Sequence, residues 1–202
     1  MKLYYSPGAC SLSPHIVLKE SGLAFEAIAA PTKTHKLLDG TDYYTINPLG
    51  YVPFLVLDDG RTLHEGPAIV QYIADQVPDQ QLAPANGSWE RYKLQEWLNT
   101  ISTELHKGFS PLFTPGMPAE AKDMAKTRLQ SRLTWVDGEL AGKTYLMGDT
   151  FTVADAYLFV VAGWSKHVAV DISGLSHLVA FMARVAARPA VQAAMRAEGL
   201  IK

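Results

Sequence analysis

A change in the hydrophobic pattern at residues 78–87 constrains the fold of this chain more than any other feature. Before it, short runs rich in β-branched and aromatic residues alternate with runs of helical period. After it, the apolar residues recur with helical period and no convincing strand appears. The stretch itself is rich in Pro, Asp, Gln, Asn and Gly, which is typical of a linker. The sequence therefore predicts one domain at residues 1–80, a linker at 81–87 and a second domain at 88–202.

The first domain is predicted to combine strands with helices. It begins with a strand at residues 2–5, a helix at 13–22 and a strand at 25–29. After an irregular or helical segment come two strands at 54–57 and 62–64 and a helix at 66–77. The Asp58-Asp59-Gly60 segment separates the last two strands and suits the turn of a β-hairpin. This order indicates a mixed sheet covered by helices, which is the arrangement of an α/β thioredoxin-like domain.

The second domain is predicted to be all helical. Its helices begin at Ser88, Pro118 and Thr152, and two more span residues 178–185 and 190–197. Thr152 and Asp155 have the spacing of a capping box, in which each side chain bonds a backbone N–H at the helix start. The predicted fold class is thus an α/β domain followed by an all-α domain.

The composition excludes several classes of protein. Hydrophobic residues make up 48% and charged residues 19% of the chain, which suits compact folded domains. A net charge of -2 without a basic stripe argues against nucleic acid as a partner. The most apolar stretch, residues 153–164, is shorter than the roughly 20 residues of a membrane-spanning helix, so no membrane association is expected. The first residues lack the apolar core of a signal peptide, which predicts a cytoplasmic location.

Cys10, the single cysteine, follows a predicted strand and precedes a predicted helix. The dipole at a helix N-terminus favours the thiolate, so Cys10 is a candidate reactive thiol. A small buried core residue is the alternative interpretation. Ser13 stands where a dithiol oxidoreductase has its second cysteine, so any redox cycle needs an external thiol.

Two further segments of the first domain are candidates for binding a peptide. Pro53 enters a strand, and a cis bond to Val52 would turn the Val52 N–H and C=O outward to pair with an extended peptide. An ordinary trans turn is the alternative. Glu65 and Gly66 open a helix, where free N–H groups suit a carboxylate and the Glu65 side chain suits an ammonium group. A plain helix start with an acidic residue would also explain them.

In the second domain, Asn99, Thr103 and His106 recur at helical offsets and share a polar face. A solvated surface explains such a face about as often as a binding site does. Aromatic residues that could line an apolar substrate pocket follow in the sequence, namely Phe109, Phe113, Tyr157 and Trp164. Their spacing also fits a plain core.

Together these residues resemble the cytosolic glutathione S-transferases of the bacterial beta class, in particular members from aromatic and biphenyl degradation pathways. The matching stretches span the chain and are residues 5–11, 47–48, 52–53, 65–66, 95–99, 104–109 and 151–157. The resemblance implies glutathione as a substrate, no metal, and a homodimer in which part of the His106 helix reaches the neighbouring subunit's site. The residues it assigns to glutathione binding are Cys10, His35, Val52, Glu65, Gly66, Asn99, Thr103, Glu104 and His106, with Cys10 and His106 as catalytic residues.

His35 stands where many members of the family have a lysine that contacts the glycyl end of glutathione. An imidazole with an unperturbed pKa of about 6.5 is only partly charged at neutral pH. The affinity for glutathione is therefore expected to weaken as the pH rises through neutrality.

The resemblance predicts a detoxifying transferase that joins the glutathione thiolate to an electrophilic xenobiotic compound. Chlorinated aromatics are one acceptor class, and dehalogenation resolved by a second thiol, through a mixed disulfide on Cys10, would use the same site. Two alternatives remain open: a monothiol glutaredoxin-like disulfide oxidoreductase and a non-catalytic carrier of apolar ligands.

Overall fold

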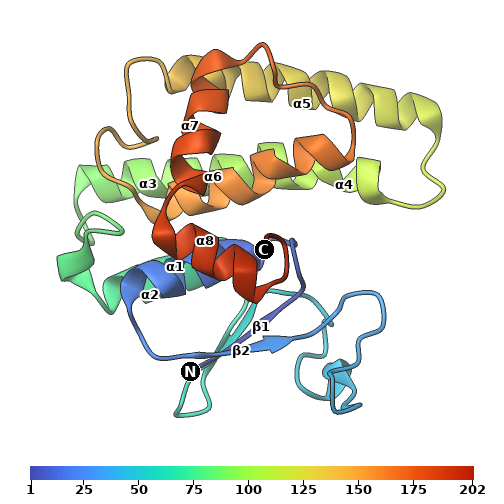
Figure 1. Cartoon of the computed structure of the whole chain (residues 1–202), viewed down its shortest axis with the longest axis vertical. Helices are drawn as coiled ribbons and strands as arrows, with labels where there is room; N and C mark the ends of the chain where they lie inside the picture. Colours follow the sequence, from blue (N-terminus) through green and yellow to red (C-terminus); the bar gives the residue numbers. More distant parts are fainter. The chain divides into compact units, whose positions relative to one another are not determined.

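The computed structural model of the chain describes residues 1–202, which form two compact units (Figure 1). The first unit comprises Met1–Ala83 and Ala187–Lys202, and the second comprises Pro84–Ala186. The end of the chain differs from the sequence prediction, which assigned residues 187–202 to the helical domain. These residues fold with the first unit because helix α8 (Pro189–Ala197) packs on helix α1 (Leu12–Ser21).

A four-stranded sheet with the order β2-β1-β3-β4 lies at the centre of the first unit. Its strands are β1 (Lys2–Tyr5), β2 (Glu26–Ala29), β3 (Phe54–Val56) and β4 (Thr62–Leu63). β2 runs parallel to β1, whereas β3 runs antiparallel to β1 and β4 antiparallel to β3. This is the mixed sheet that the order of elements predicts, and the predicted fold class is confirmed.

The helices of the first unit are α1, α2 (Gly66–Asp75) and α8, with short 3-10 turns η1 (Tyr43–Thr45) and η2 (Pro78–Gln80). α1 contacts both α2 and α8, and the three helices lie side by side (Figure 1). Most of α1 is buried, which explains why its sequence is apolar on more than one face. α1 ends at Gly22, whose φ of 70° is the left-handed cap that glycine adopts without strain. The loop before α1 is thus joined to a firmly packed helix.

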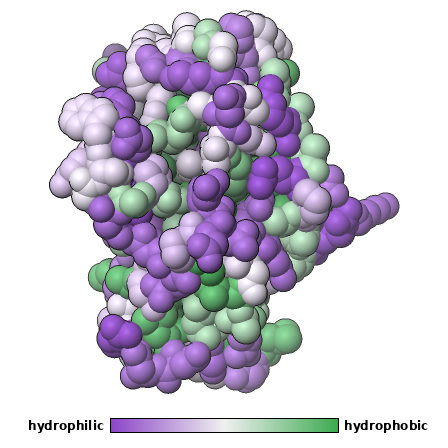
Figure 2. Space-filling model, turned by 90° about the vertical axis from the view of Figure 1, so that its left-hand side faces the viewer, coloured by the Kyte–Doolittle hydropathy of each residue, from purple (hydrophilic) through white to green (hydrophobic).

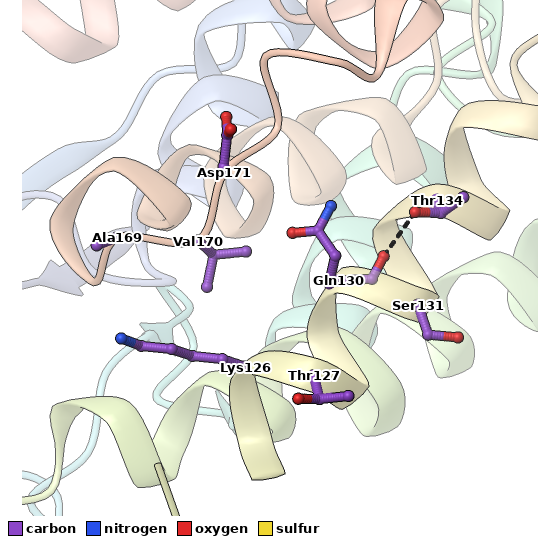
Figure 3. A pocket seen from close by; sticks show the side chains of 8 residues that line it. All are labelled: Lys126, Thr127, Gln130, Ser131, Thr134, Ala169, Val170 and Asp171. Atoms are coloured by element: carbon purple, nitrogen blue, oxygen red, sulfur yellow. Dashed lines mark hydrogen bonds between the residues drawn. The ribbon is translucent and has the colours of Figure 1, made fainter. Parts of the chain in front are cut away.

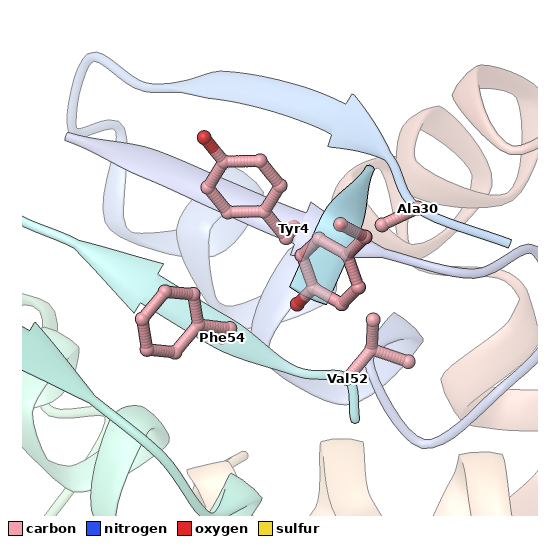
Figure 4. Packing of buried hydrophobic residues seen from close by; sticks show 5 residues of the cluster. Tyr4, Ala30, Val52 and Phe54 are labelled. Atoms are coloured by element: carbon pink, nitrogen blue, oxygen red, sulfur yellow. The ribbon is translucent and has the colours of Figure 1, made fainter. Parts of the chain in front are cut away.

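An apolar cluster of the first unit packs Tyr4, Ala30, Tyr43, Val52 and Phe54 together (Figure 4). Tyr43 is fully buried, and its hydroxyl donates a hydrogen bond to the Tyr51 carbonyl at 2.9 Å. The buried Asn47 side chain donates to the same carbonyl at 2.8 Å. The chain entering the Val52-Pro53 step is therefore held by two hydrogen bonds as well as by the packing of Val52.

The second unit is all helical, as predicted. Its elements are α3 (Trp89–Thr100), η3 (Ile101–His106), α4 (Lys107–Phe113), α5 (Ala119–Glu139), α6 (Val153–Gly163), η4 (Trp164–His167) and α7 (Ser176–Ala186). α6 contacts α3, η3 and α7, and every residue from Val153 to Ala162 is buried. It begins with the predicted capping box, since Thr152 and Asp155 bond each other's backbone N–H groups. The η3 segment is π-helical, a feature that the sequence pattern did not predict.

Hydrophilic and hydrophobic residues are interspersed over the face that Figure 2 shows. None of the helices combines the length and the apolar character that crossing a bilayer requires.

Candidate functional site

Cys10 lies two residues before α1 and is partly buried. Its carbonyl accepts a hydrogen bond from the Ser13 N–H at 3.1 Å, so Cys10 belongs to the first turn that leads into the helix. The thiol lies 3.2 Å from the Val52 carbonyl oxygen, to which a protonated thiol donates. The sulfur therefore lies at the start of a helix and beside the predicted binding segment at Val52. This environment favours a reactive or ligand-facing thiol over an inert core residue.

The Val52-Pro53 peptide bond is cis. The Val52 carbonyl faces the Cys10 thiol, whereas the Val52 N–H donates no hydrogen bond within the chain. One residue therefore offers a donor and an acceptor beside the sulfur, which is the pattern that an extended peptide needs.

Glu65 has a φ of 67° and a ψ of 118°, a conformation that residues other than glycine seldom adopt. Its carbonyl accepts hydrogen bonds from the N–H groups of Ala68 and Ile69 in the first turn of α2. Its side chain is exposed, and Gly66 supplies the first N–H of the helix. A carboxylate and a free helix N-terminus are thus adjacent, so both ends of an amino-acid group could be bound here.

His35 also has a positive φ, of 51°. Its ring stacks on Tyr44 with a centroid distance of 4.5 Å, and its Nδ1 is buried without a hydrogen-bond partner. Gly50 packs against the Tyr44 ring so closely that no side chain fits, because a Cβ added there would lie 2.6 Å from the ring. The ring of His35 is therefore fixed by packing, while Nδ1 is turned into the protein.

His106 ends the π-helical segment of the second unit. Its Nδ1 lies 2.7 Å from the Tyr157 hydroxyl, and its ring meets the Trp164 ring edge-on at 4.9 Å. Burial lowers the pKa of His106 to about 4, and the charge of Lys107 contributes to the shift. A phenol is the better donor and a neutral imidazole the better acceptor, so Tyr157 donates to Nδ1. The proton of the neutral ring is then on Nε2, which makes His106 a hydrogen-bond donor at neutral pH.

The four predicted pocket residues lie in one aromatic cluster of the second unit. Trp164 contacts Phe109 and Phe113 edge-on, with centroid distances of 5.8 and 5.9 Å. Phe109 and Tyr157 are buried, as the core interpretation expects. Phe113 is 49% exposed and Trp164 is partly exposed. The cluster therefore combines a buried layer with an accessible apolar surface.

The sequence matches the glutathione S-transferase N-terminal domain over residues 8–76 and the C-terminal domain over residues 100–189. A relative, glutathione S-transferase GstA of Escherichia coli O157:H7, is 50% identical over 99% of this chain and 100% of its own length. The chain belongs to the glutathione S-transferase family. This transferase is therefore an enzyme, and the hypothesis of a non-catalytic carrier is not supported.

Solved structures place the transferase within its family. A structure described as a ternary complex of BphK, a bacterial GST, shares 60% identity and a TM-score of 0.97 over 99% of this chain and 100% of that chain. A beta class glutathione S-transferase of Sphingomonas chungbukensis shares 51% identity and a TM-score of 0.96 over 100% of both chains. A sphingomonad glutathione S-transferase solved with glutathione is 48% identical, with a TM-score of 0.95 over 100% of both chains. The transferase is thus a bacterial beta-class member.

Glu104 of the transferase is bonded within the second unit, and its role in glutathione binding stays a prediction. Its carboxylate accepts hydrogen bonds from Arg128 at 3.0 Å and from Arg132 at 2.8 Å, both on α5. These two arginines lower the pKa of Glu104. Its side chain therefore joins η3 to α5. The signal for this was present in the sequence, because Arg128 and Arg132 are four residues apart and share a helix face.

Asn99 and Thr103 of the transferase are both exposed. The Thr103 hydroxyl donates to the Asn99 carbonyl at 3.0 Å, so this polar group is already used within the helix. The Thr103 hydroxyl oxygen can still accept a hydrogen bond, and the roles of Asn99, Thr103 and His106 in glutathione binding stay predictions.

A separate groove of about 490 Å³ lies in the second unit of the transferase (Figure 3). It runs between α5, at Lys126, Gln130 and neighbouring residues, and the segment at Val170. None of the predicted site residues lines it.

Proposed function

We propose that this transferase binds glutathione along the first unit and joins the glutathione sulfur to an electrophilic carbon. The observation that carries the proposal is the unpaired Val52 N–H, with the Val52 carbonyl 3.2 Å from the Cys10 thiol. The cysteinyl residue of glutathione would accept a hydrogen bond from the Val52 N–H and donate its own N–H to the Val52 carbonyl. Its side chain would then lie beside Cys10.

The γ-glutamyl end of the same peptide suits the start of α2. This end carries an α-carboxylate and an ammonium group. The Gly66 N–H and the helix dipole favour the carboxylate, and the exposed Glu65 carboxylate favours the ammonium. The unusual backbone conformation of Glu65 supports this role, because such strain, about 1–3 kcal/mol, is most often retained at ligand sites.

The glycyl carboxylate is assigned to His35, whose ring is held by Tyr44. An imidazole N–H can donate a hydrogen bond to a carboxylate, so removal of the ring should weaken glutathione binding. Titration calorimetry with glutathione tests this with His35→Ala, and His35→Lys, which keeps a donor, is the comparison. An affinity that is unchanged in His35→Ala would contradict the assignment.

The thiolate of glutathione needs a hydrogen-bond donor to lower its energy as it attacks. Cys10 supplies a thiol in the first unit, and the resemblance assigns the second role to His106. The neutral state of His106 and the bond from Tyr157 to Nδ1 support a donor at Nε2 rather than a base. In conjugation the sulfur forms a bond to the electrophilic carbon and the leaving group departs with the bonding electrons.

The acceptor class is proposed to be apolar aromatic electrophiles, chlorinated ones included. The exposed faces of Phe113 and Trp164 offer stacking surface to a planar ring. Chloride is a stable leaving group, so displacement from an activated ring needs no further cofactor. Dehalogenation follows if a second thiolate attacks the sulfur of the adduct. An S–S bond forms as the carbon–sulfur bond breaks, and the carbon keeps the bonding pair and takes up a proton, which gives the reduced compound and a disulfide.

Thiol–disulfide exchange is a second candidate function, favoured by the partial exposure of Cys10 at the start of α1. The Cys10 thiolate would attack a mixed disulfide of glutathione, form a new S–S bond to glutathione and release the other thiolate. A second glutathione thiolate would then restore Cys10 and leave as glutathione disulfide. This cycle needs no second cysteine in the chain.

The family resemblance also implies a homodimer, which we propose for this chain. Large hydrophobic side chains are exposed on two helices of the second unit. Trp89 and Tyr92 lie in the first turn of α3, and Met124 lies on α5. Exposed apolar surface of this kind is typical of subunit contacts. Sedimentation equilibrium should give twice the chain mass, and a charged substitution of Met124 should shift the species toward the monomer. A single monomeric species at every protein concentration would contradict the proposal.

Two assays with one variant test the function. Conjugation of glutathione to a chlorodinitrobenzene and glutathione-dependent reduction of a mixed disulfide are measured for the wild type and Cys10→Ala. Loss of disulfide reduction with conjugation retained assigns Cys10 to exchange, and loss of both assigns it to a shared catalytic role. Absence of glutathione binding and of both activities in the wild type would refute the proposed function. Gly66→Pro is the matched binding variant, because it removes the N–H offered to the γ-glutamyl carboxylate.

A further inference from the structure

Glu198 has a buried carboxylate directly after α8. Its Oε2 accepts a hydrogen bond from the Gly8 N–H at 2.9 Å. Its Oε1 lies 2.8 Å from the His15 Nδ1. The exposed fractions of the two side chains are 0% for Glu198 and 1% for His15. A carboxylate removed from water to this extent is costly unless each oxygen is bonded, and both oxygens are.

The two groups that Glu198 binds lie on either side of Cys10. Gly8 is two residues before it in the loop, and His15 lies in the first turns of α1. Gly8 has a φ of 71°, which a side chain would strain, and the Leu200 side chain lies 3.4 Å from the position of a Cβ at Gly8. One carboxylate therefore connects the loop before the thiol to the helix after it.

His15 is fixed independently of this bond. Its ring lies between those of Tyr5 and Phe25, with centroid distances of 5.5 and 5.6 Å. Its Nε2 is buried and has no hydrogen-bond partner. The packed His15 ring therefore restrains the Glu198 carboxylate through Oε1. The same carboxylate restrains the Gly8 N–H through Oε2.

Further hydrogen bonds lie within the loop. The Ser6 N–H donates to the Ser11 hydroxyl oxygen at 3.0 Å, and that hydroxyl donates to the Ser6 carbonyl at 3.2 Å. These bonds close the turn. The bond from Gly8 to Glu198 ties the turn to the stretch after α8, across 190 positions of the sequence, and the contact of Cys10 with the Val52 carbonyl ties it to the segment before β3.

We propose that Glu198 is a positioning residue for Cys10, holding the loop so that the thiol stays beside the Val52 carbonyl. The consequence for catalysis rests on the proposed role of Cys10 in the glutathione site. Without the carboxylate, the Gly8 N–H loses its acceptor and the loop gains freedom. The thiol then spends less time at 3.2 Å from Val52 and is more accessible to reagents.

The chain offers a matched control for the packing of α8. Arg188 binds Glu20 of α1, with its Nε 2.6 Å from Oε1 and its Nη2 2.9 Å from Oε2. This ion pair joins the same two helices, but it does not contact the loop at Gly8. Arg188→Met should therefore weaken the docking of α8 without releasing the thiol.

The test compares Glu198→Ala, Glu198→Gln and Arg188→Met with the wild type. The first readout is the rate of Cys10 alkylation by iodoacetamide, measured without glutathione. The second is hydrogen exchange of the Gly8 amide, followed by NMR. Loss of a charge-assisted hydrogen bond should change both by roughly tenfold in Glu198→Ala. Glu198→Gln keeps an oxygen acceptor and should restore much of the wild-type behaviour, and Arg188→Met should behave as wild type.

Alkylation and Gly8 exchange that are unchanged in Glu198→Ala, or changed equally in Arg188→Met, would overturn the inference. If Glu198→Ala does not fold, Glu198→Asp replaces it, because the shorter side chain cannot reach Gly8 and His15 together. An unchanged alkylation rate in Glu198→Asp would then overturn the inference. The KM for glutathione is measured separately. A change in alkylation without a change in KM would refute the proposed role of Cys10 while leaving the positioning role intact.

Discussion

His106 is predicted to remain neutral until the pH falls to about 4. The cause is its environment, because the ring lies against Trp164 and Tyr157 and next to the positive charge of Lys107. In the unfolded chain the imidazole takes up a proton at its ordinary pKa of 6.5. Between these two pH values the unfolded state binds more protons than the folded state, so the folded state is destabilised as the pH falls.

The size of the effect follows from the shift in pKa. At about pH 4 the difference between the folded and unfolded pKa values of His106 lowers the free energy of unfolding by about 3 kcal/mol relative to neutral pH. Above the unfolded pKa this term vanishes. A loss of about 3 kcal/mol is a large part of the stability of a typical domain.

The assay is urea denaturation of the wild type and His106→Asn across this pH range. Asp155 is a buried carboxyl whose pKa burial raises to about 6, and its proton uptake changes stability in the opposite direction. Because both proteins contain Asp155, its contribution cancels in the difference. Between neutral pH and about pH 4, the free energy of unfolding of His106→Asn should therefore rise by about 3 kcal/mol relative to that of the wild type. An NMR titration of the His106 ring with a midpoint at its ordinary value, or two parallel stability curves, would refute the reasoning.

Three further predictions follow from single contacts. Tyr157→Phe removes the donor to His106 Nδ1, so the nitrogen NMR shifts of the ring should change from a fixed Nε2–H form to a mixture of tautomers, and unchanged shifts would contradict the assignment. Thr152→Ala removes one half of the α6 capping box and should lower the free energy of unfolding by about 1 kcal/mol in urea titrations, whereas an unchanged value would show that the box adds nothing. Gly50→Ala places a Cβ 2.6 Å from the Tyr44 ring at a φ of 67°, so it should cost about 1 kcal/mol or more and weaken glutathione binding at His35, and wild-type affinity would contradict that link.

Local signals predicted most of the fold. The strands at β1 and β3 and the cap at Gly22 follow from short-range composition, and the capping box of α6 follows from two residues three positions apart. Such features depend on hydrogen bonds between near neighbours, so the sequence contains the information for them. The same holds for the start of α3, where the Ser88 side chain accepts a hydrogen bond from the Arg91 N–H.

The π-helical segment η3 was not predictable in this way. Its widened turn carries no residue pattern that separates it from an α-helix, and it alters the angular positions of Thr103 and His106 relative to an ideal helix. Reasoning from α-helical offsets placed Asn99, Thr103 and His106 on one equivalent face. The structure instead leaves Asn99 exposed and turns the His106 ring into the aromatic cluster.

Long-range contacts determine the remainder of the site. They show that the environment of Cys10 depends on more than the residues next to it in the sequence. The order of residues around Cys10 predicts a helix start and a dipole, which would be the same in many helices. What distinguishes this position is that two distant segments contact it. Val52 contacts the thiol, and Glu198 binds Gly8 in the loop before it. Because the second contact comes from the stretch after α8, the last residues fold with the first unit rather than with the helical one. The placement of residues 187–202 in the first unit and the positioning of the thiol therefore have one physical cause, the docking of α8 on α1.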